Sequence, residues 1–509
     1  MKIKLSIIPA LAIACAILAG CGQGDAGQVQ TAAAEALTET AGSAQHAQTD
    51  MFTSRDMNSA FDDSVITIKL ENGSAACESE AVSISGGVIT LSREGSYLFS
   101  GSLEEGMIIV DAPKDAKLQL VLQNAHISSS SSAAIYVRQA DKVFLTLADG
   151  TENSLSNGGS FTALDENNID GAVWSKEDMS INGGGKLSIA SPAGHGIVCK
   201  DDLVIYGGEL DVTAAEHGID ANDSVRIGAG SLSIDSGKDG IHAETGDDEE
   251  LGFVYMAGGE TDISCGDDGI HAGEYLKICA GSLNIAESSE GLEALRVYIE
   301  GGEINIRAED DGINAAGGTA SGSPEGGFGG GIPANGGMGG PAGHPGHGGH
   351  GAVPDAPGIP GGAAGMSSKG EINISGGRLY IVAYGDGLDA NGSISISGGD
   401  TVVCGPVRGD TATLDYDVSA IVSGGSFIGT GAYGMAQSFS GSEQGLLAVS
   451  TGNRTGGTEL RLEDERGGLI LSHTPELDYA VVIISSPDII SGETYRLYVG
   501  SDSAELQAK

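Results

Sequence analysis

Acidic and histidine side chains recur at two fixed positions of a repeated Asp-Gly-Ile-x-Ala motif. The first position is held in turn by His217, Asp239, Asp268, Glu290, Asp311 and Asp386, and the position three residues later by Asp220, His242, His271, Glu293, Asn314 and Asp389. If the motifs stack, these residues form two columns. Carboxylates about 5 Å apart repel by about 1 kcal/mol in water, and by more where solvent is excluded. Such columns need a bridging cation, protonation or solvent.

Calcium is the cation that best suits these columns. It takes six to eight oxygen ligands, and carbonyls at the corners can complete a shell begun by carboxylates. His242 and His271 argue against calcium beside themselves. The predicted calcium ligands are acids of the columns and their neighbours: Asp239, Asp267, Asp268, Glu290, Asp310, Asp311, Asp386 and Asp389. The alternative is an acidic edge that solvent alone relieves.

A different set of residues could contact sugars. Aromatic residues are only 5% of the chain, yet four of them fall on the outward positions of the third predicted strand of the repeat, interleaved with basic residues. Flat rings stack on sugar faces, and Lys or Arg hydrogen-bonds hydroxyls or pairs with uronates. The predicted contacts are Arg226, Phe253, Tyr255, Tyr275, Lys277, Arg296 and Tyr298, with Trp174 as a further platform. The alternative is that such side chains simply suit exposed strands.

Other histidines and the cysteines carry weaker signals. His344, His347 and His350 could bind a transition metal, but the Gly-rich stretch around them favours a solvated loop. Beyond Cys15 and Cys21, five cysteines remain, an odd number without a CxxC pair. We therefore expect neither a disulfide framework nor a zinc site among them, but small buried core residues.

The elements that position these residues follow from the spacing of the motif. The step is 22 residues from His195 to His217, from His217 to Asp239 and from Asp268 to Glu290, and 21 from Glu290 to Asp311. The longer steps, 29 to Asp268 and 75 to Asp386, contain an acidic insert and a Gly-rich stretch. A period near 22 with three short strands predicts an all-β fold, a right-handed parallel β-helix.

Alternation within the repeat predicts which side chains form the core. Leu210 and Val212 follow a Gly-Gly pair, and Ile241 and Ala243 belong to the motif, so all four should point inward. Glu209, Asp211 and His242 should then face solvent. A β-sandwich needs hairpins that would not keep this spacing, and the calcium β-roll repeats too quickly.

Composition changes divide the chain into five parts. Residues 1–20 read as a lipoprotein signal peptide, ending in Leu18-Ala19-Gly20 before Cys21, the predicted lipidation site. Residues 21–50 are a tether, and 51–165 are N-terminal coils and a cap. The β-helix occupies 166–440, with a Gly-rich insertion at 317–369, and 441–509 form a C-terminal cap. These features predict a lipid-anchored protein on the extracellular face of a bacterial membrane.

The charge of the chain limits its partners. A formal net charge of -45 argues against nucleic acid and against an anionic membrane surface. The membrane should be contacted through the lipid anchor only. We expect a monomer whose partner is a polysaccharide.

Several segments resemble a known family, the clostridial-type cell-surface proteins with a carbohydrate-binding domain. The resemblance lies in Gly95-Ser96-Tyr97-Leu98-Phe99-Ser100-Gly101, in Leu120-Val121-Leu122-Gln123-Asn124-Ala125-His126-Ile127, in the motifs and in Gly492-Glu493-Thr494-Tyr495. It implies a pectate-lyase-like β-helix that binds polysaccharides such as cellulose or pectic acid and carries calcium. It does not imply an enzyme. The family's corner Asp is replaced by His195, His217 and Glu290, which puts metal sites there in doubt.

We therefore expect a non-catalytic, calcium-stabilised polysaccharide-binding protein. One alternative is a calcium-dependent lyase, which would need a cationic base beside the acids, and Lys238 is the nearest candidate. A hydrolase would need two carboxylates at working separation. A structural adhesin without sugar binding is the third possibility, and the fold alone does not choose among them.

Overall fold

The computed structural model describes residues 51–62, 64–246, 250–315 and 370–509. Over these ranges the backbone forms strands, turns and bends but no helix, so none of it could cross a membrane as a helix. Contacts divide the chain into Met1–Met51 and Phe52–Lys509, and every strand belongs to the second unit. The predicted signal peptide, Cys21, the tether, the Gly-rich insertion and its three histidines lie outside the described residues.

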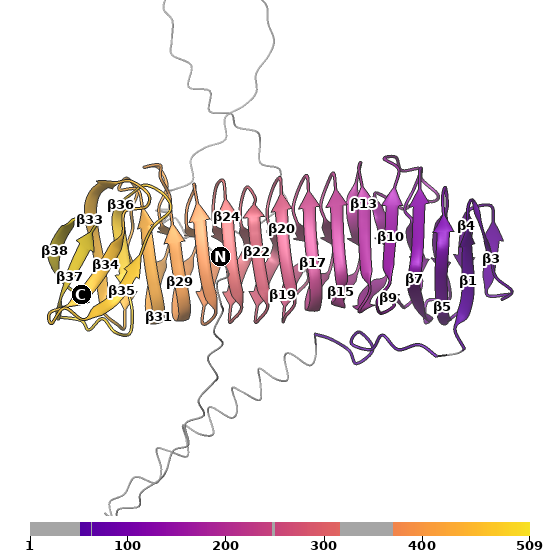
Figure 1. Cartoon of the computed structure of the whole chain (residues 1–509), viewed down its shortest axis with the longest axis horizontal. Helices are drawn as coiled ribbons and strands as arrows, with labels where there is room; N and C mark the ends of the chain where they lie inside the picture. Colours follow the sequence, from indigo (N-terminus) through magenta and orange to yellow (C-terminus); the bar gives the residue numbers. More distant parts are fainter. Residues whose placement is uncertain (1–50, 63, 247–249, 316–369) are drawn as a thin grey trace, which may run out of the picture. The chain divides into compact units, whose positions relative to one another are not determined.

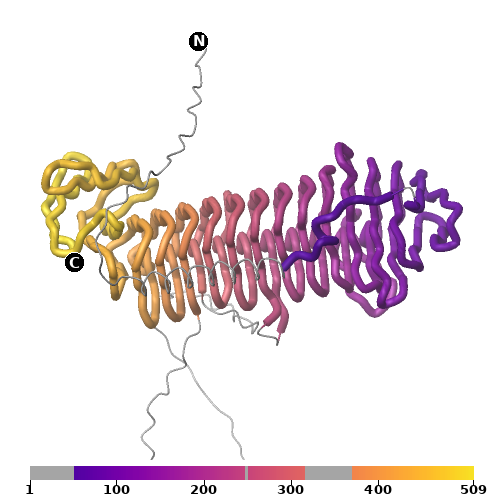
Figure 2. The backbone as a smooth tube through the Cα atoms, turned by 90° about the horizontal axis from the view of Figure 1, so that it is seen from below, coloured from indigo at the N-terminus to yellow at the C-terminus, as the bar shows by residue number. Residues whose placement is uncertain are grey.

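The strands of Phe52–Lys509 are wound into stacked coils, as predicted in outline (Figure 1). Strands of one coil pair in parallel with those of the next, which makes three ladders along the stack. The tube view in Figure 2 shows the same succession of coils from indigo to orange. Several long strands bend at a corner and contribute to two ladders.

The first ladder contains the repeated motif, and we call it the motif ladder. Its strands are β6 (Met107–Asp111), β8 (Ile135–Gln139), β11 (Gly171–Ser175), β14 (His195–Cys199), β16 (Ile219–Ala221), β18 (Ile241–Ala243), β21 (Ile270–Ile278), β23 (Leu292–Ile299), β25 (Ile313–Ala315), β28 (Leu388–Ala390) and β30 (Leu414–Tyr416).

The second ladder carries most of the aromatic residues predicted to bind sugar, and we call it the aromatic ladder. Besides parts of β21 and β23, its strands are β5 (Gly95–Leu103), β7 (Lys117–Ser129), β9 (Lys142–Leu147), β12 (Asp178–Gly183), β15 (Asp202–Ala214), β17 (Ser224–Ser236), β19 (Phe253–Met256), β26 (Glu371–Ile374), β29 (Ser393–Cys404) and β31 (Ser419–Gly431).

The third ladder begins after the Gly-Gly corners. The later halves of β7, β15, β17, β29 and β31 belong to it, together with β10 (Glu152–Asn157), β13 (Lys186–Ser191), β20 (Glu260–Cys265), β22 (Ser282–Glu287), β24 (Glu303–Ala308) and β27 (Arg378–Ala383).

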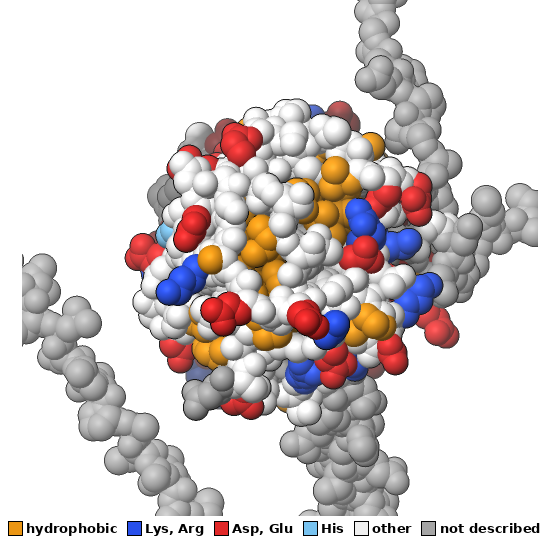
Figure 3. All heavy atoms as spheres, turned by 90° about the vertical axis from the view of Figure 1, so that its right-hand side faces the viewer, with side chains coloured by type: hydrophobic (Ala, Val, Ile, Leu, Met, Phe, Trp, Pro, Cys, Tyr) orange, Lys and Arg blue, Asp and Glu red, His pale blue; other side chains and the backbone are white. Residues whose placement is uncertain are grey.

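Antiparallel pairs occur at both ends of the stack, where open edges would otherwise invite pairing with another chain. At one end β1 (Ile66–Glu71) pairs with β2 (Ser74–Ala76), and β3 (Val82–Ser85) pairs with β4 (Val88–Leu91). Figure 3 views this end and shows apolar, acidic and basic side chains side by side.

The other end is built differently. There β36 (Tyr479–Ser485) lies between β31 and β33 (Leu446–Arg454), antiparallel to both, and the short β32 (Gly441–Ser442) pairs in parallel with β31. A separate antiparallel sheet follows, made of β34 (Leu460–Asp464), β35 (Leu469–His473), β37 (Thr494–Val499) and β38 (Asp502–Gln507).

The apolar core runs inside the coils, as the alternation predicts. Leu210, Val212, Ile241 and Ala243 are all buried. The motif glycine is required by packing, because a Cβ at Gly240 would lie 2.6 Å from the Gly269 carbonyl oxygen of the next coil. The corner after β17's first half needs glycine for a different reason, since Gly230 has a φ of 102°.

Residues 52–62 form a strap across the outer face of the aromatic ladder (Figure 2). The ring of Phe52 contacts that of Tyr206 of β15 at a centroid distance of 5.2 Å. The side chain of Asp56 forms an ion pair with Lys142 of β9 at 3.0 Å. The Asn182 amide donates to the Asp56 carbonyl at 3.0 Å. The strap therefore covers the outer face of several coils, a face that alternation along the strands would predict to be exposed to solvent.

Candidate functional site: the acid and histidine columns

The two predicted columns lie side by side on successive coils of the motif ladder. In the second column, Asp220 pairs in register with His242, and His242 with His271. The column continues through Glu293, Asn314 and Asp389. In the first column, each carbonyl accepts a hydrogen bond from the preceding coil, for example Asp239 from Gly218 at 3.0 Å. Parallel stacking thus brings together residues far apart in sequence.

Histidines dominate the first coils of the site. The rings of His195 and His217 stack at 5.1 Å, those of His217 and His242 at 4.6 Å, and those of His242 and His271 at 5.0 Å. Protonating all of these histidines would place like charges in contact, so their protonated forms need neighbouring carboxylates to offset the repulsion.

Each of the later histidines has a carboxylate partner. His242 Nδ1 lies 3.0 Å from Asp220 Oδ1, and His271 Nδ1 lies 2.7 Å from Glu293 Oε2. Burial alone would lower the pKa of His242, but hydrogen bonds to Asp220 and Glu244 outweigh it and raise the pKa to about 9. The pKa of His271 is raised to about 11 against the same burial, by Asp268 and Glu293.

Carboxylates dominate the later coils, and burial raises their pKa values. Burial first, then the charges of Asp268 and Glu293, raises the pKa of Glu290 to about 8. Burial and the neighbouring acids likewise raise the pKa of Asp268 to about 7 and that of Asp389 to about 7. Crowded carboxylates that resist ionisation indicate a place where a proton or a cation is favoured.

Three of these acids form an all-oxygen group. One carboxylate oxygen from each of Asp311, Asp386 and Asp389 lies within 4.8 Å of the other two. Beside them, Asn314 is 9% exposed, and its Nδ2 donates to Glu290 Oε2 at 2.9 Å. Its Oδ1 is buried without a hydrogen-bond partner. A buried orphan oxygen beside three carboxylates fits an ion that prefers oxygen ligands.

The remaining predicted calcium ligands are distributed less evenly. Asp239, Asp267 and Asp268 form a second all-oxygen group, also within 4.8 Å. Asp310 instead pairs with Arg408 at 3.3 Å and is more than half exposed. Among the described residues, neither Asp310 nor Glu290 belongs to a group of three potential ligands.

Three aromatic residues predicted to contact sugar are buried, so the expectation of an exposed ring is wrong for each. Phe253 is 6% exposed and stacks on Tyr275. Tyr255 is 4% exposed because Phe52 of the strap lies over it, at 6.1 Å between ring centroids. Trp174 is 3% exposed and packs edge-on against Tyr136 at 5.4 Å.

The other predicted sugar contacts lie together on the aromatic ladder. Tyr275 pairs in register with Arg296, and Lys277 with Tyr298, so these four make a patch in which each tyrosine neighbours a cation of the adjacent coil. We call it the tyrosine–cation patch. All four side chains are partly exposed. Arg226 lies three coils before Arg296 and forms an ion pair with Asp202 at 2.7 Å.

The cations of this face are already paired with acids. Arg296 contacts Glu274 at 3.0 Å, and Lys277 contacts Glu300 at 2.8 Å. The patch is therefore close to neutral, although the chain as a whole is strongly acidic.

Sequence reasoning missed two features of the site. Glu244 joins His242 and His271 in a group of potential ligands, and it follows His242 by two residues on the outward face. Alternation could have found it. The strap carried no comparable signal, because its contacts join residues that are far apart in the sequence, such as Asp56 and Asn182.

Comparison with known proteins yields three findings. A family described as carbohydrate-binding domain-containing protein matches residues 85–327. A carbohydrate-binding domain-containing protein of Acetivibrio thermocellus is 38% identical over 229 residues, which are 42% of this chain and 80% of that protein. A solved structure of the polysaccharide lyase-like protein from C. thermocellum, a gadolinium derivative, has 29% identity, covers 47% of this chain and 93% of its own, and gives a TM-score of 0.42.

Proposed function

This chain belongs to the family of carbohydrate-binding domain-containing proteins, and from that premise we propose that it binds a polysaccharide without cleaving it. The observation that carries the proposal is the tyrosine–cation patch. There two tyrosines and two cations occupy neighbouring positions on one outer sheet face. A repeating polymer can bridge such positions along the stack.

The two tyrosines of the patch differ in whether another aromatic ring stacks on them. The ring of Tyr275 stacks on Phe253 at 4.7 Å, so one of its faces is occupied. Tyr298 has no ring stacked on it among the described aromatic residues. Tyr298 is thus the residue that stacks on a sugar ring, while the hydroxyl of Tyr275 hydrogen-bonds to it.

The charges of the patch favour a neutral polysaccharide. A uronate could pair with Arg296 or Lys277 only by displacing Glu274 or Glu300. A neutral glycan can accept hydrogen bonds from the same cations while the pairs stay intact. Of the two polymers that the family resemblance implies, cellulose fits better than pectic acid.

Calcium stabilises the coils in this proposal. Asp311, Asp386 and Asp389 would hold it, with the Asn314 carbonyl oxygen as a neutral ligand. Asp239, Asp267 and Asp268 offer a second position. The ion would supply positive charge where several buried carboxylates meet.

Cleavage is not part of the proposal. Lys238, the nearest candidate base, pairs with Glu216, and this hydrogen bond raises the pKa of Lys238. A base must be able to lose its proton near the working pH, and this ion pair opposes that loss.

The remaining features of the proposal concern placement and winding. Lipidation of Cys21 would hold the protein at the outer face of the cell membrane. The coils would wind to the right in the pectate-lyase-like manner, because crossovers between parallel strands are right-handed in about 98% of cases. Metabolic labelling with a fatty acid tests the first point, since a Cys21→Ser chain should take up no label. A crystal structure with left-handed coils would refute the second.

Affinity electrophoresis tests the binding proposal directly. Gels are cast with hydroxyethylcellulose, with polygalacturonate or without polymer, each in calcium or in EDTA. We expect retardation in hydroxyethylcellulose, weaker retardation in polygalacturonate and no ultraviolet-absorbing unsaturated product from either. Equal mobility in all gels would contradict binding, and unsaturated product would establish a lyase instead.

A further inference from the structure

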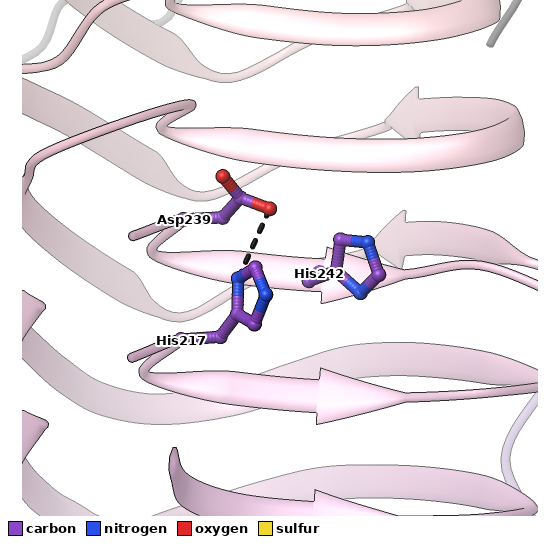
Figure 4. A group of neighbouring side chains, drawn as sticks. All are labelled: His217, Asp239 and His242. Atoms are coloured by element: carbon purple, nitrogen blue, oxygen red, sulfur yellow. Dashed lines mark ion pairs between the residues drawn. The ribbon is translucent and has the colours of Figure 1, made fainter. Parts of the chain in front are cut away.

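A row of histidines lies next to carboxylates on the motif ladder and shares Asp239 with the group formed by Asp239, Asp267 and Asp268. His217 and His242 come from neighbouring coils, and their rings are 4.6 Å apart. Asp239 follows His217 in the first column and belongs to the same coil as His242. The three side chains thus meet at one corner (Figure 4).

The three side chains present ligand atoms to one another. One nitrogen from each of His217 and His242 and one oxygen from Asp239 lie within 4.8 Å of one another. The side chains are 15%, 18% and 6% exposed, so they are largely desolvated but still reachable from solvent. In Figure 4 the imidazole of His217 points at the carboxylate of Asp239, with the ring of His242 alongside.

The shortest contact has the spacing of two ligands on one ion. His217 Nδ1 lies 3.1 Å from Asp239 Oδ2, yet this buried nitrogen has no hydrogen-bond partner of acceptable geometry. Bonds of about 2.0–2.1 Å from both atoms to a shared ion would enclose an angle of about 100°, close to tetrahedral. A shared metal ion would therefore suit the spacing of His217 Nδ1 and Asp239 Oδ2 better than a direct hydrogen bond does.

The ring of His242, the third ligand, is held in place by hydrogen bonding to Asp220. His242 Nδ1 lies 3.0 Å from Asp220 Oδ1, and the other oxygen of Asp220 lies 3.0 Å from Lys200 Nζ. A carboxylate on Nδ1 fixes the orientation of the ring and directs Nε2 to a metal, as in carboxylate–histidine–metal arrangements. Nε2 also lies 3.6 Å from Glu244 Oε2, so an ion bound there would replace this contact. Asp220 is a positioning residue in this arrangement.

We propose that His217, Asp239 and His242 form a binding site for a late first-row transition-metal dication such as Zn²⁺. Imidazole nitrogens suit such ions, whereas calcium prefers oxygen alone. Three protein ligands leave a fourth position for water or an exogenous ligand. The site does not rest on polysaccharide binding, and its ligands are imidazoles and a carboxylate rather than cysteines.

The test uses the full chain with His344, His347 and His350 replaced by Ser, because these histidines could also bind metal. After treatment with EDTA, the protein is titrated with Co²⁺ and then with Zn²⁺. We expect one equivalent of Co²⁺ to give the visible absorption of a four- or five-coordinate ion without a thiolate charge-transfer band, and Zn²⁺ to bleach it. Excess Ca²⁺ should not.

Variants assign the signal to the site. His217→Ala and His242→Ala should each weaken Co²⁺ binding by more than about tenfold, and Asp220→Asn by about tenfold through loss of orientation. His126→Ala is the matched control, since His126 is exposed on β7 and its Nδ1 lies 2.9 Å from the Ser154 hydroxyl, away from the motif ladder. Circular dichroism of each variant shows that it is folded, and His217→Gln, which keeps the polar bulk, provides a second test.

The outcomes separate this site from polysaccharide binding. Retention in hydroxyethylcellulose gels should be unchanged in His217→Ala, so the two proposals can fail independently. The metal site is refuted if Co²⁺ gives no such absorption, if the absorption survives both histidine variants, or if Ca²⁺ bleaches it as readily as Zn²⁺.

Discussion

The ring of Tyr275 lies 4.7 Å from that of Phe253 on the preceding coil, and the two planes are only 6° apart. Stacking of this kind follows from the parallel register, which pairs the two residues directly. It also determines which tyrosine of the tyrosine–cation patch has a ring face to offer.

The first prediction concerns the different roles proposed for Tyr298 and Tyr275. Tyr298→Ala should weaken binding to hydroxyethylcellulose by about tenfold, the equivalent of about 1.4 kcal/mol for a lost stacking contact, while Tyr298→Phe should retain it. Tyr275→Phe should lose less than tenfold, because only a hydroxyl is removed. Affinity electrophoresis measures all three. Tyr384→Ala, an exposed tyrosine outside the patch, is the control, and an equal loss there would contradict the assignment.

The second prediction concerns calcium. Chelation should lower the melting temperature of the wild-type chain, because an ion bound only to the folded state stabilises it by about 2.7 kcal/mol at a hundred times its Kd. Asp389→Asn removes one of three crowded charges, so its melting temperature should respond less to EDTA. Differential scanning calorimetry with and without EDTA measures both. Asp235→Asn, an exposed acid on β17, should respond like wild type. A wild-type curve unchanged by EDTA would exclude calcium stabilisation.

The third prediction concerns pH. The folded state raises the pKa of Glu290 from 4.5 to about 8, so between these values the folded protein binds more protons than the unfolded chain. In EDTA, stability should therefore fall as pH rises through this window, by up to about 1.4 kcal/mol per pH unit from this group. Glu290→Gln should flatten the dependence. Urea unfolding at pH 5 and pH 8 measures it, and the exposed Glu287→Gln should keep the wild-type slope.

The fourth prediction concerns the strap. Asp56 and Lys142 form a pair 3.0 Å apart whose side chains are 1% and 11% exposed. Lys142→Met leaves the buried Asp56 carboxylate without its cation and should cost about 3 kcal/mol in urea unfolding. Asp56→Asn added to Lys142→Met should recover part of this loss. Lys186→Met removes an exposed pair with Glu209 and should cost less than about 1 kcal/mol. Equal costs at the two lysines would contradict a buried pair.

The stacking of the coils could be predicted because it follows from the regular spacing of the repeated motif. Motif positions 22 residues apart pair directly, and even Asp311 and Asp386, 75 residues apart, meet on neighbouring coils. The columns of the candidate site follow from this register alone. Buried Ile241 and partly exposed His242 likewise follow from alternation within one strand.

The burial of Tyr255 and the pairing of Asp310 could not be predicted in this way. Both depend on contacts between distant segments: Phe52 with Tyr255, and Arg408 with Asp310. Period-two alternation shows on which face of a strand a side chain lies, but it does not show what covers that face. The same limit applies to Trp174, which is buried in one cluster with Ile169 of the segment between β10 and β11.

The junction between β25 and β28 has a consequence for how such a chain can diversify. Ile313 pairs with Leu388, and Gly312 donates to the Asp386 carbonyl at 2.8 Å, as if the chain between them added one ordinary coil. Because the stack closes over this point without a change of register, foreign sequence grafted between Ala315 and Gly370 would leave the scaffold's pairing intact. Evolution or an engineer could exchange the sequence at this point while the strand pairing before and after it is kept.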